Sequence, residues 1–362
     1  MLPGLTRRLL GDWDSLFPGV SSPGFINYLA VTGSIEGGTT TFLAFTKQNY
    51  HPLFAVKVHR HPDAQERAQN EGELLKFLHL TGGELSSSVP RVILCERIAG
   101  VWMLVQTIIS GHPMPAPTAG DGTPDIKCAI RNIDLATGWL VKLHSLGQVS
   151  KAASRLKEEA LKTAEEFLRL FDLTRVEKEY VEKIANELEL LTNNCKMAIQ
   201  HGDFCRHNIL FTINSNGTGL GVIDWTDGKM EGFPLNDLFF FLTTYYLQFR
   251  RNSKIEGFVQ AFEEAFFSDS AYSKIVRDFV GKYCNALKLT AEGTEAFFAL
   301  FLMERAIFEL KKVGQCLRRG AIPRGTIFMA IHEKLDFKQA FGAQFWIHFF
   351  KLLVRLRSAF IL

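Results

Sequence analysis

The sequence has few cysteines, and their spacing matches no metal site. Six cysteines are scattered over 362 residues, with no CxxC pair and no Cys/His spacing of the kind that holds zinc. Scattered cysteines of this kind are typical of reduced thiols in a cytosolic protein rather than of a disulfide framework. This composition excludes a disulfide-rich secreted fold and indicates a cytoplasmic protein.

An excess of charge of one sign and a long apolar stretch at the start are also missing. Lys plus Arg total 41 and Asp plus Glu total 38, and the net charge of +3 carries no signature of nucleic-acid binding. Gly11, Asp12 and Asp14 interrupt the first apolar residues, so we expect neither a secretory signal nor export. The sequence thus predicts no nucleic-acid partner, and any anion-binding site must be local.

Hydrophobic residues make up 47% of the chain, enough for a full core, and in the first third they alternate with polar residues. Such alternation predicts β-strands, and apolar residues at helical spacing after Pro62 predict one helix among them. The strands are expected within residues 25–46 (two strands), 53–59, 91–95 and 101–108. A Pro- and Gly-rich stretch, residues 111–124, then separates this part from the rest.

Beyond this linker the apolar residues follow helical spacing, first over residues 133–146. A hairpin interrupts the helices, because the apolar runs 208–211 and 220–223 flank an Asn-Gly turn. We therefore predict an α+β fold of two lobes. The N-lobe, an antiparallel sheet with one helix, covers residues 1–110, and a larger, mainly helical C-lobe covers residues 111–362.

Three oxygen-bearing side chains lie around this hairpin in the sequence. Asp203 precedes Asn208 by five residues, and Asp224 follows the second strand of the hairpin. Magnesium prefers one or two carboxylates together with phosphate and water oxygens, and phosphoryl transfer needs a further carboxylate as base. Asp203 can serve as that base, with Asn208 and Asp224 on the metal. The alternative is that Asp203 and Asp224 are turn residues that cap the hairpin.

The same segment carries a family resemblance. Residues 201–210, with the sequence His-Gly-Asp-Phe-Cys-Arg-His-Asn-Ile-Leu, and the later Ile-Asp-Trp resemble motifs of the aminoglycoside phosphotransferase and choline kinase superfamily. The resemblance implies a protein-kinase-like fold, with ATP and Mg²⁺ as cofactors. It implies that Asp203 is the catalytic base, that Asn208 is a magnesium ligand, and that Asp224 is the counterpart of the metal-binding Asp of the kinase DFG motif.

Two further residues are expected to support the catalytic loop. The stretch 232–238 is similar to the family's G-x-P-x-x-D-L motif, which implies that Asp237 braces the loop. A helix N-cap is the other role for Asp237, and the two roles are compatible. His201 is expected to order the loop through hydrogen bonds. The chain departs from the family pattern at Cys205, where protein kinases carry Lys and several relatives carry His.

The first third of the chain agrees with this resemblance. Lys57 lies on the third predicted strand and Glu71 on the following helix, where the family places the ion pair that grips the α- and β-phosphates of ATP. Glu73 is a rival partner, but Glu71 fits the family's E-x-x-x-L-x-x-L register. Taken alone, Lys57 and Glu71 would be typical of exposed surface charges.

A glycine-rich turn and a hinge complete the expected nucleotide site. Gly33, Gly37 and Gly38 would fold over the phosphates, because residues without a Cβ let backbone N–H groups approach anionic oxygens. By itself such a run is also typical of a plain hairpin turn. Residues 105–110 are expected to form the hinge whose backbone meets adenine.

These residues together predict an ATP-dependent small-molecule kinase. The expected reaction transfers the γ-phosphoryl group to a hydroxyl of a sugar, an amino alcohol or a related metabolite. The alternatives are a catalytically silent pseudokinase or scaffold, and an aminoglycoside-inactivating phosphotransferase. Cations outnumber carboxylates from residue 226 onward. This weakens the alternative of an aminoglycoside-inactivating phosphotransferase, because a polycationic acceptor calls for a carboxylate-rich cleft.

The last stretch, residues 345–362, is apolar and aromatic but contains three cations. Lys351, Arg355 and Arg357 would each be costly inside a bilayer, so we do not expect the segment to span a membrane. Two arrangements remain. The segment packs against the helical lobe, or it lies as a basic aromatic helix at a membrane surface, which would make the protein membrane-peripheral.

Overall fold

A computed structural model shows that the chain forms two compact units. The sheet unit comprises Met1–His112 and Leu210–Lys229, and the helical unit comprises Pro113–Ile209 and Met230–Leu362. The division expected from the sequence was consecutive and grouped residues 210–229 with the helices, whereas their contacts lie with the sheet. The structure describes residues 1–33, 39–47, 49–60, 62–117, 125–146, 153–191, 196–214, 217–247, 255–290, 293–318, 343–360 and 362.

A five-stranded antiparallel sheet is the frame of the sheet unit, and its strand order is β1-β2-β3-β5-β4. Side chains alternate between the two faces of each strand, so Phe54, Val56 and Val58 on β3 share one face while Lys57 lies on the other. The five strands are β1 (Asn27–Gly33), β2 (Thr39–Thr46), β3 (Asn49–His59), β4 (Val92–Ile98) and β5 (Val101–Thr107).

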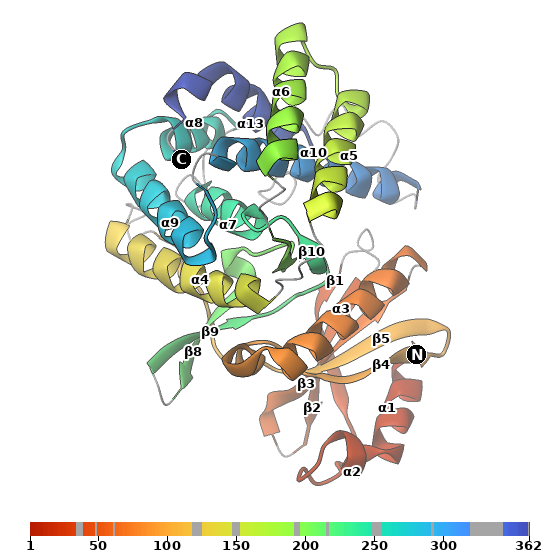
Figure 1. Cartoon of the computed structure of the whole chain (residues 1–362). Coiled ribbons are helices and arrows are strands. Elements are labelled where there is room, and N and C mark those ends of the chain that lie inside the picture. The colour runs from red at the N-terminus through yellow and green to blue at the C-terminus, as the bar shows by residue number, and fades with distance from the viewer. Residues whose placement is uncertain are drawn as a thin grey trace. The chain divides into compact units, whose positions relative to one another are not determined.

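Helices cover both faces of this sheet (Figure 1). On the Lys57 face lies α3 (Pro62–Thr81), whose Leu74, Leu75 and Leu78 are buried, and the short 3-10 helix η1 (Gly83–Ser88) follows it. The opposite face is covered by α1 (Leu2–Gly11) and α2 (Trp13–Leu16). The sequence pattern predicted one helix in this lobe, which corresponds to α3, whereas α1 and α2 were not predicted.

The helices α1 and α2 are held by apolar residues at four-residue steps. Leu5, Leu9, Trp13 and Phe17 are all buried in one core with the face of β3 that carries Phe54. The rings of Trp13 and Phe17 stack at 4.2 Å, and Phe17 lies 5.4 Å from the ring of Phe54. A four-residue repeat of apolar side chains is the signal that could have predicted these helices.

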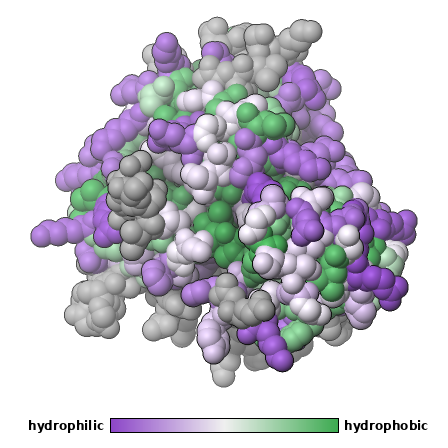
Figure 2. Space-filling view, turned by 90° about the horizontal axis from the view of Figure 1, so that it is seen from below, coloured by the Kyte–Doolittle hydropathy of each residue, from purple (hydrophilic) through white to green (hydrophobic). Residues whose placement is uncertain are grey.

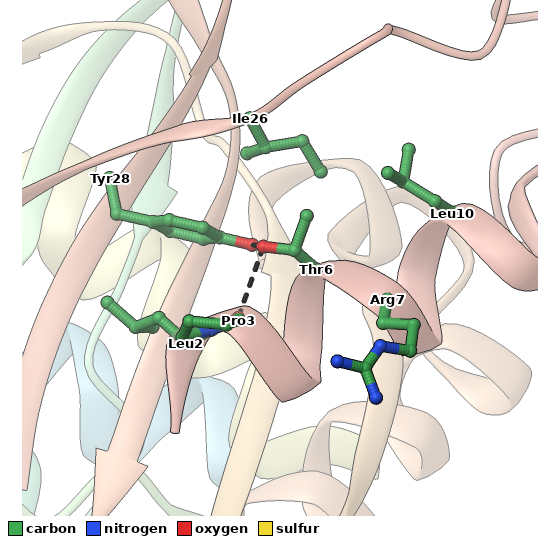
Figure 3. Close-up of a pocket in the computed structure, with 7 residues that line it drawn as sticks. All are labelled: Leu2, Pro3, Thr6, Arg7, Leu10, Ile26 and Tyr28. Atoms are coloured by element: carbon green, nitrogen blue, oxygen red, sulfur yellow. Dashed lines mark hydrogen bonds between the residues drawn. The ribbon is translucent and has the colours of Figure 1, made fainter.

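A shallow groove lies between α1 and β1, and Figure 3 shows the side chains that line it. The hydroxyls of Thr6 and Tyr28 meet across it at 3.0 Å. Tyr28 pairs with Ala44, which in turn pairs with Phe54, so Tyr28 lies on the sheet face opposite to Lys57. The groove therefore lies on the other face of the sheet from Lys57.

The predicted hairpin is formed by β8 (Ile209–Asn214) and β9 (Gly217–Val222), with the short β6 (His112–Pro113) paired to β8. Two glycines allow the chain after β5 to lie against it. A Cβ on Gly111 would lie 2.6 Å from the carbonyl oxygen of Phe211, and a Cβ on Gly221 would overlap the side chain of Ile109. This close approach is the physical reason why residues 210–229 belong to the sheet unit.

The helical unit is built around α7 (Asn236–Leu247), whose residues from Asp237 to Leu247 are all buried. A helix that is apolar on every side lies at the centre of a core. The surrounding helices are α4 (Ile126–Leu146), α5 (Ala153–Leu170), α6 (Arg175–Leu191), α8 (Ile255–Phe267), α9 (Ala271–Leu287), α10 (Thr294–Arg318) and α13 (Ala343–Leu356). The smaller elements are β7 (Ala198–Gln200), β10 (Lys229–Gly232), η3 (Arg206–Asn208) and η6 (Arg357–Ala359).

The C-terminal helix α13 packs into this core with its aromatic side chains. Phe349 stacks on Phe262 of α8 at 3.9 Å, and Trp346 lies edge-on against Phe301 of α10 at 5.5 Å. Phe350 meets Phe167 of α5 at 4.8 Å. Of the two arrangements expected for residues 345–362, the structure shows the one in which the segment packs against the helical lobe.

The surface of the protein carries apolar side chains as well as polar ones. Figure 2 shows a face on which hydrophilic side chains lie around the rim and hydrophobic ones gather near the middle. In the part of the chain that the structure describes, no helix combines the length and apolar character needed to cross a bilayer.

The buried leucines of α1 lead to a stability prediction. Leu9 is fully buried, whereas Leu80 on α3 is 86% exposed, so the same truncation can be compared at both positions. We expect Leu9→Ala to lower the free energy of unfolding by about 2–5 kcal/mol, and Leu80→Ala to change it by less than about 0.5 kcal/mol. Urea unfolding followed by circular dichroism measures both. Equal effects of the two substitutions would contradict the assigned position of α1.

Candidate active site

Lys57 lies at the centre of a buried polar cluster in the sheet unit. Its side-chain amine lies 2.6 Å from Glu71 Oε1, 2.6 Å from Asp224 Oδ1 and 3.0 Å from Thr226 Oγ1. An ammonium group has three N–H donors, so these three acceptors use all of them. The arrangement brings together residues that are 14, 167 and 169 positions away from Lys57 in the sequence.

The choice between the two candidate glutamates is clear in the structure. Glu71 is 1% exposed and bonds Lys57, whereas Glu73 lies exposed on α3. Gly72, between them, lets α3 approach β4, because a Cβ there would lie 3.1 Å from Cys95 Sγ. The close approach holds the part of α3 that carries Glu71 against the sheet.

Electrostatics stabilise the charged form of Lys57 beside Glu71 and Asp224. Burial alone would lower the pKa of Lys57, but the charges of Glu71 and Asp224 outweigh burial and raise this pKa above its ordinary value. Burial raises the pKa of Glu71, and the nearby charge of Lys57 opposes that rise. Two buried charges of opposite sign in direct contact avoid the large cost that either would have alone.

Asp224 stands in an unusual backbone conformation just after β9. Its φ is +65°, in the left-handed region that few residues other than Gly, Asn and Asp adopt. Its side chain is 49% exposed although one oxygen bonds Lys57, so the carboxylate can be reached from solution. An accessible carboxylate anchored by a buried cation suits a ligand for a hard cation such as Mg²⁺.

Thr226 is a residue of this cluster that was not predicted from the sequence. Its hydroxyl has one proton, which it can donate to Asp224 Oδ1 at 2.7 Å or to Glu71 Oε2 at 3.1 Å. Thr226 follows Asp224 by two residues, and nothing in the sequence pattern marked it as part of the cluster. A second link joins this segment to α3, since Arg67 pairs with Asp227.

An apolar strip crosses the sheet on the same face as Lys57. Leu29 of β1 pairs with Leu43 of β2, which pairs with Ala55 of β3, two residues before Lys57. Leu29 is 56% exposed. Strand alternation places these side chains beside the Lys57 cluster, where they offer a flat apolar surface of the kind on which an aromatic ring can lie.

The glycine-rich turn and the hinge are the remaining parts of the expected nucleotide site. Gly33 is the last residue of β1 and pairs with Thr40 of β2. Gly37 and Gly38 lie outside the described residues, as do residues 118–124 of the expected linker. Within the expected hinge, 105–110, the strand β5 ends at Thr107 and the following residues have no regular structure.

The loop after β7 holds the second cluster, which belongs to the helical unit. Gly202 has a φ of +80°, and Asp203 follows it directly. Asn208 donates from Nδ2 to the backbone oxygen of Asp203 and to its Oδ2, both at 2.9 Å. This leaves the amide oxygen of Asn208 as the atom of its side chain that suits a metal ion. Phe204, fully buried against Trp139, anchors the loop in the core.

Asp237 braces this loop from the first turn of α7. Its two oxygens accept the backbone N–H of His201 at 2.7 Å and of Gly202 at 2.9 Å. His144 of α4 lies 3.4 Å from the same carboxylate and 2.5 Å from the hydroxyl of Tyr283. His201 itself orders the loop, because its Nδ1 accepts the backbone N–H of Asp203 at 3.2 Å.

Each unit has a side-chain oxygen that suits magnesium, but the described residues provide no complete set of ligands. Asp224 offers a carboxylate and Asn208 an amide oxygen, which are hard donors of the type Mg²⁺ takes. Among the described residues, no group of three or more His, Cys, Asp and Glu side chains could hold a metal by itself. Each unit therefore offers one oxygen donor that suits a magnesium ion whose other ligands are phosphate and water.

A comparison with protein-family models identifies the family of the chain. Residues 39–274 match the model described as "Phosphotransferase enzyme family". The chain belongs to this family. The match confirms the predicted superfamily, the two-lobed protein-kinase-like fold and the prediction of a phosphotransferase. No curated protein matches the chain significantly.

Solved structures similar to this phosphotransferase include a choline kinase from Streptococcus pneumoniae, at 14% identity and a TM-score of 0.47, with 96% of this chain and 98% of that chain covered. An aminoglycoside phosphotransferase from Streptomyces rimosus, in complex with ADP and streptomycin, is similar at 14% identity and a TM-score of 0.43, with coverage of 81% and 96%. A GDP complex of an aminoglycoside 2'-phosphotransferase has 13% identity, a TM-score of 0.47 and coverage of 87% and 98%.

The buried carboxylate of Asp237 leads to a prediction about acid stability. Burial alone would raise the pKa of Asp237, but the hydrogen bond and charge of His144, together with His201, lower it below 3.8. A group whose pKa is lower in the folded state stabilises the fold above its unfolded-state pKa, and this stability is lost as the pH falls through the folded pKa.

We therefore expect the free energy of unfolding of the wild-type protein to fall as the pH drops below about 4, the ordinary pKa of an Asp side chain. Asp237→Asn should be less stable at pH 7 and should have a shallower pH dependence in that acid range. Urea unfolding at a series of pH values measures both slopes. Parallel slopes for the two proteins would show that the carboxylate does not contribute in this way.

Proposed function

We propose that this phosphotransferase is an ATP- and Mg²⁺-dependent kinase that transfers the γ-phosphoryl group to a hydroxyl of a sugar, an amino alcohol or a related small metabolite. The observation that carries the proposal is the position of the Lys57 amine, which contacts Glu71 and Asp224 at 2.6 Å each. A lysine held by a helix glutamate beside a metal-binding aspartate is the arrangement with which kinases grip a nucleotide's phosphates.

Each residue has a distinct part in the proposed reaction. Lys57, oriented by Glu71, neutralises charge on the phosphate oxygens, and the apolar strip at Leu29 and Leu43 supports the base of the nucleotide. Asp203 accepts the proton of the acceptor hydroxyl as that oxygen attacks the γ-phosphorus, and the bond from the γ-phosphorus to the leaving diphosphate oxygen breaks. Asn208 and Asp224 would hold Mg²⁺, which screens the phosphate charge when bound.

The described carboxylates of α10 bear on the class of acceptor. A polycationic aminoglycoside would need several carboxylates that are available to its amines, whereas three of those on α10 already bond protein groups. The pairs are Glu295 with Tyr180, Glu304 with Asn236, and Glu309 with Arg305. Together with the excess of cations over carboxylates from residue 226 onward, these bonds favour an acceptor of low positive charge over an aminoglycoside.

The test is ATP consumption in the presence of Mg²⁺ with separate pools of sugars, amino alcohols and aminoglycosides, followed by mass spectrometry of the phosphorylated products. We expect turnover with a neutral or singly charged hydroxyl compound. Turnover only with aminoglycosides would favour the antibiotic-modifying alternative. Nucleotide binding without turnover in any pool would favour a pseudokinase, and parallel assays with GTP establish the nucleotide preference.

The two aspartates should separate chemistry from metal-supported binding. We expect Asp203→Asn to bind ATP with Mg²⁺ as the wild type does but to lose about 10²–10⁴-fold in kcat, because the base is removed. Asp224→Asn should lose the Mg²⁺-dependent part of nucleotide affinity, because a carboxylate ligand is replaced by an amide. Calorimetric titration and steady-state kinetics measure the two effects. Wild-type turnover in Asp203→Asn would reject the assigned base.

The glutamates of α3 provide a matched pair of substitutions. Glu71→Gln weakens the hold on Lys57, so we expect kcat/KM for ATP to fall by about 10–100-fold, the scale of a misplaced binding group. Glu73→Gln changes the same chemical group at an exposed position, and its kinetics should equal those of the wild type. If Glu73→Gln were the more damaging change, the assigned ion pair would be wrong.

A further inference from the structure

Arg305 of α10 reaches the loop that carries Asp203. Its Nη1 donates to the backbone oxygen of Gly202 at 3.2 Å, and Gly202 immediately precedes Asp203. The helix α10 begins at Thr294, beyond residues 39–274 that match the family model. No role for Arg305 therefore follows from the family match.

The guanidinium of Arg305 is held in a fixed orientation. The side chain is 14% exposed, and its other Nη donates to Glu309 Oε1 at 3.0 Å. Its central carbon lies 4.2 Å from the centroid of the Phe240 ring, 4.9 Å from that of Phe308 and 5.6 Å from that of Trp346. Stacking on aromatic rings together with an ion pair leaves a planar guanidinium little freedom, so its donors point in set directions.

Both backbone polar groups of Gly202, its N–H and its carbonyl, form hydrogen bonds. Its N–H donates to Asp237 at the start of α7, and its carbonyl accepts from Arg305 of α10. Gly202 has a positive φ of +80°, a conformation that glycine adopts readily. The peptide plane between Gly202 and Asp203 includes the carbonyl that Arg305 bonds and the N–Cα bond of Asp203, so holding this plane restricts where the Asp203 side chain can lie.

We propose that Arg305 is a positioning residue for phosphoryl transfer, which fixes the carbonyl of Gly202 and so orients the carboxylate of Asp203. The inference rests on the proposed function, in which Asp203 is the base. Arg305 is not a catalytic residue, because its contacts are with Gly202, Glu309 and aromatic rings. Through Trp346 the same guanidinium also contacts the C-terminal helix α13, so packing of that helix is coupled to the loop.

The experiment compares Arg305→Met and Arg305→Lys with Lys311→Met on the full chain. Methionine keeps an unbranched apolar stem against the rings but cannot donate to Gly202. Lysine keeps the charge but cannot hold Gly202 and Glu309 with the planar fork of a guanidinium. Lys311, on the same helix, pairs with Glu166 at the surface and serves as the control. Thermal unfolding provides the folded fraction, to which each kcat is normalised.

We expect kcat of Arg305→Met to fall by about 10–100-fold with an unchanged KM for ATP, because a small displacement of a reacting group costs rates of this order. Arg305→Lys should lie between Arg305→Met and the wild type, and Lys311→Met should equal the wild type. In hydrogen–deuterium exchange, the amides of residues 199–205 should exchange faster in Arg305→Met than in the control. A purely structural role would lower the folded fraction and leave the normalised kcat unchanged.

Wild-type normalised kcat in folded Arg305→Met would overturn the inference. If Arg305→Met does not fold, Arg305→Lys decides, and wild-type values of both kcat and loop exchange in that variant would overturn it. Absence of ATP turnover in the wild-type protein with every acceptor pool is a different result, since it would refute the proposed function itself. Turnover in the wild type that is insensitive to Arg305 refutes only the positioning role.

Discussion

The buried ammonium of Lys57 is the constraint on which the sheet unit depends. A cation removed from water is costly unless carboxylates surround it, and here Glu71, Asp224 and Thr226 occupy its three donors. Because these partners come from α3 and from the segment after β9, the single charge ties the helix and the hairpin to the strand β3. Removing one partner would leave the others with unbalanced charge in a buried place.

The helical unit also contains a buried charge that is fully hydrogen-bonded, but here the charge is negative. Asp237 is a buried carboxylate whose oxygens take up the N–H groups of His201 and Gly202, with His144 beside it. In both units a fully bonded buried charge fixes a neighbouring carboxylate that is more accessible. Lys57 does this for Asp224 and Asp237 does it for the loop of Asp203, so rigidity and access to a ligand are provided by different residues.

The last third of the chain contributes more than bulk to the helical unit. Aromatic rings from α7, α10 and α13 fill its core, and Arg305 lies among them with its guanidinium facing Phe240 and Trp346. A cation inside an aromatic core is stable because ring faces and Glu309 replace part of its hydration. The same packing explains why the apolar side chains of residues 345–354 are buried within the helical unit.

Much of this protein is determined locally by the sequence. Alternation predicted the strands, helical spacing predicted α3 and α4, and the motifs around Asp203 and Asp224 identified the family that the match later showed. Which residues contact one another was decided by the tertiary structure. Burial distinguishes Glu71, which bonds Lys57, from the exposed Glu73. Thr226 and Arg305 contact the two clusters although no sequence signal predicted it. The reason is that residue type and local spacing set an element and its faces, whereas a contact between positions 57 and 226, or 202 and 305, depends on how whole elements pack.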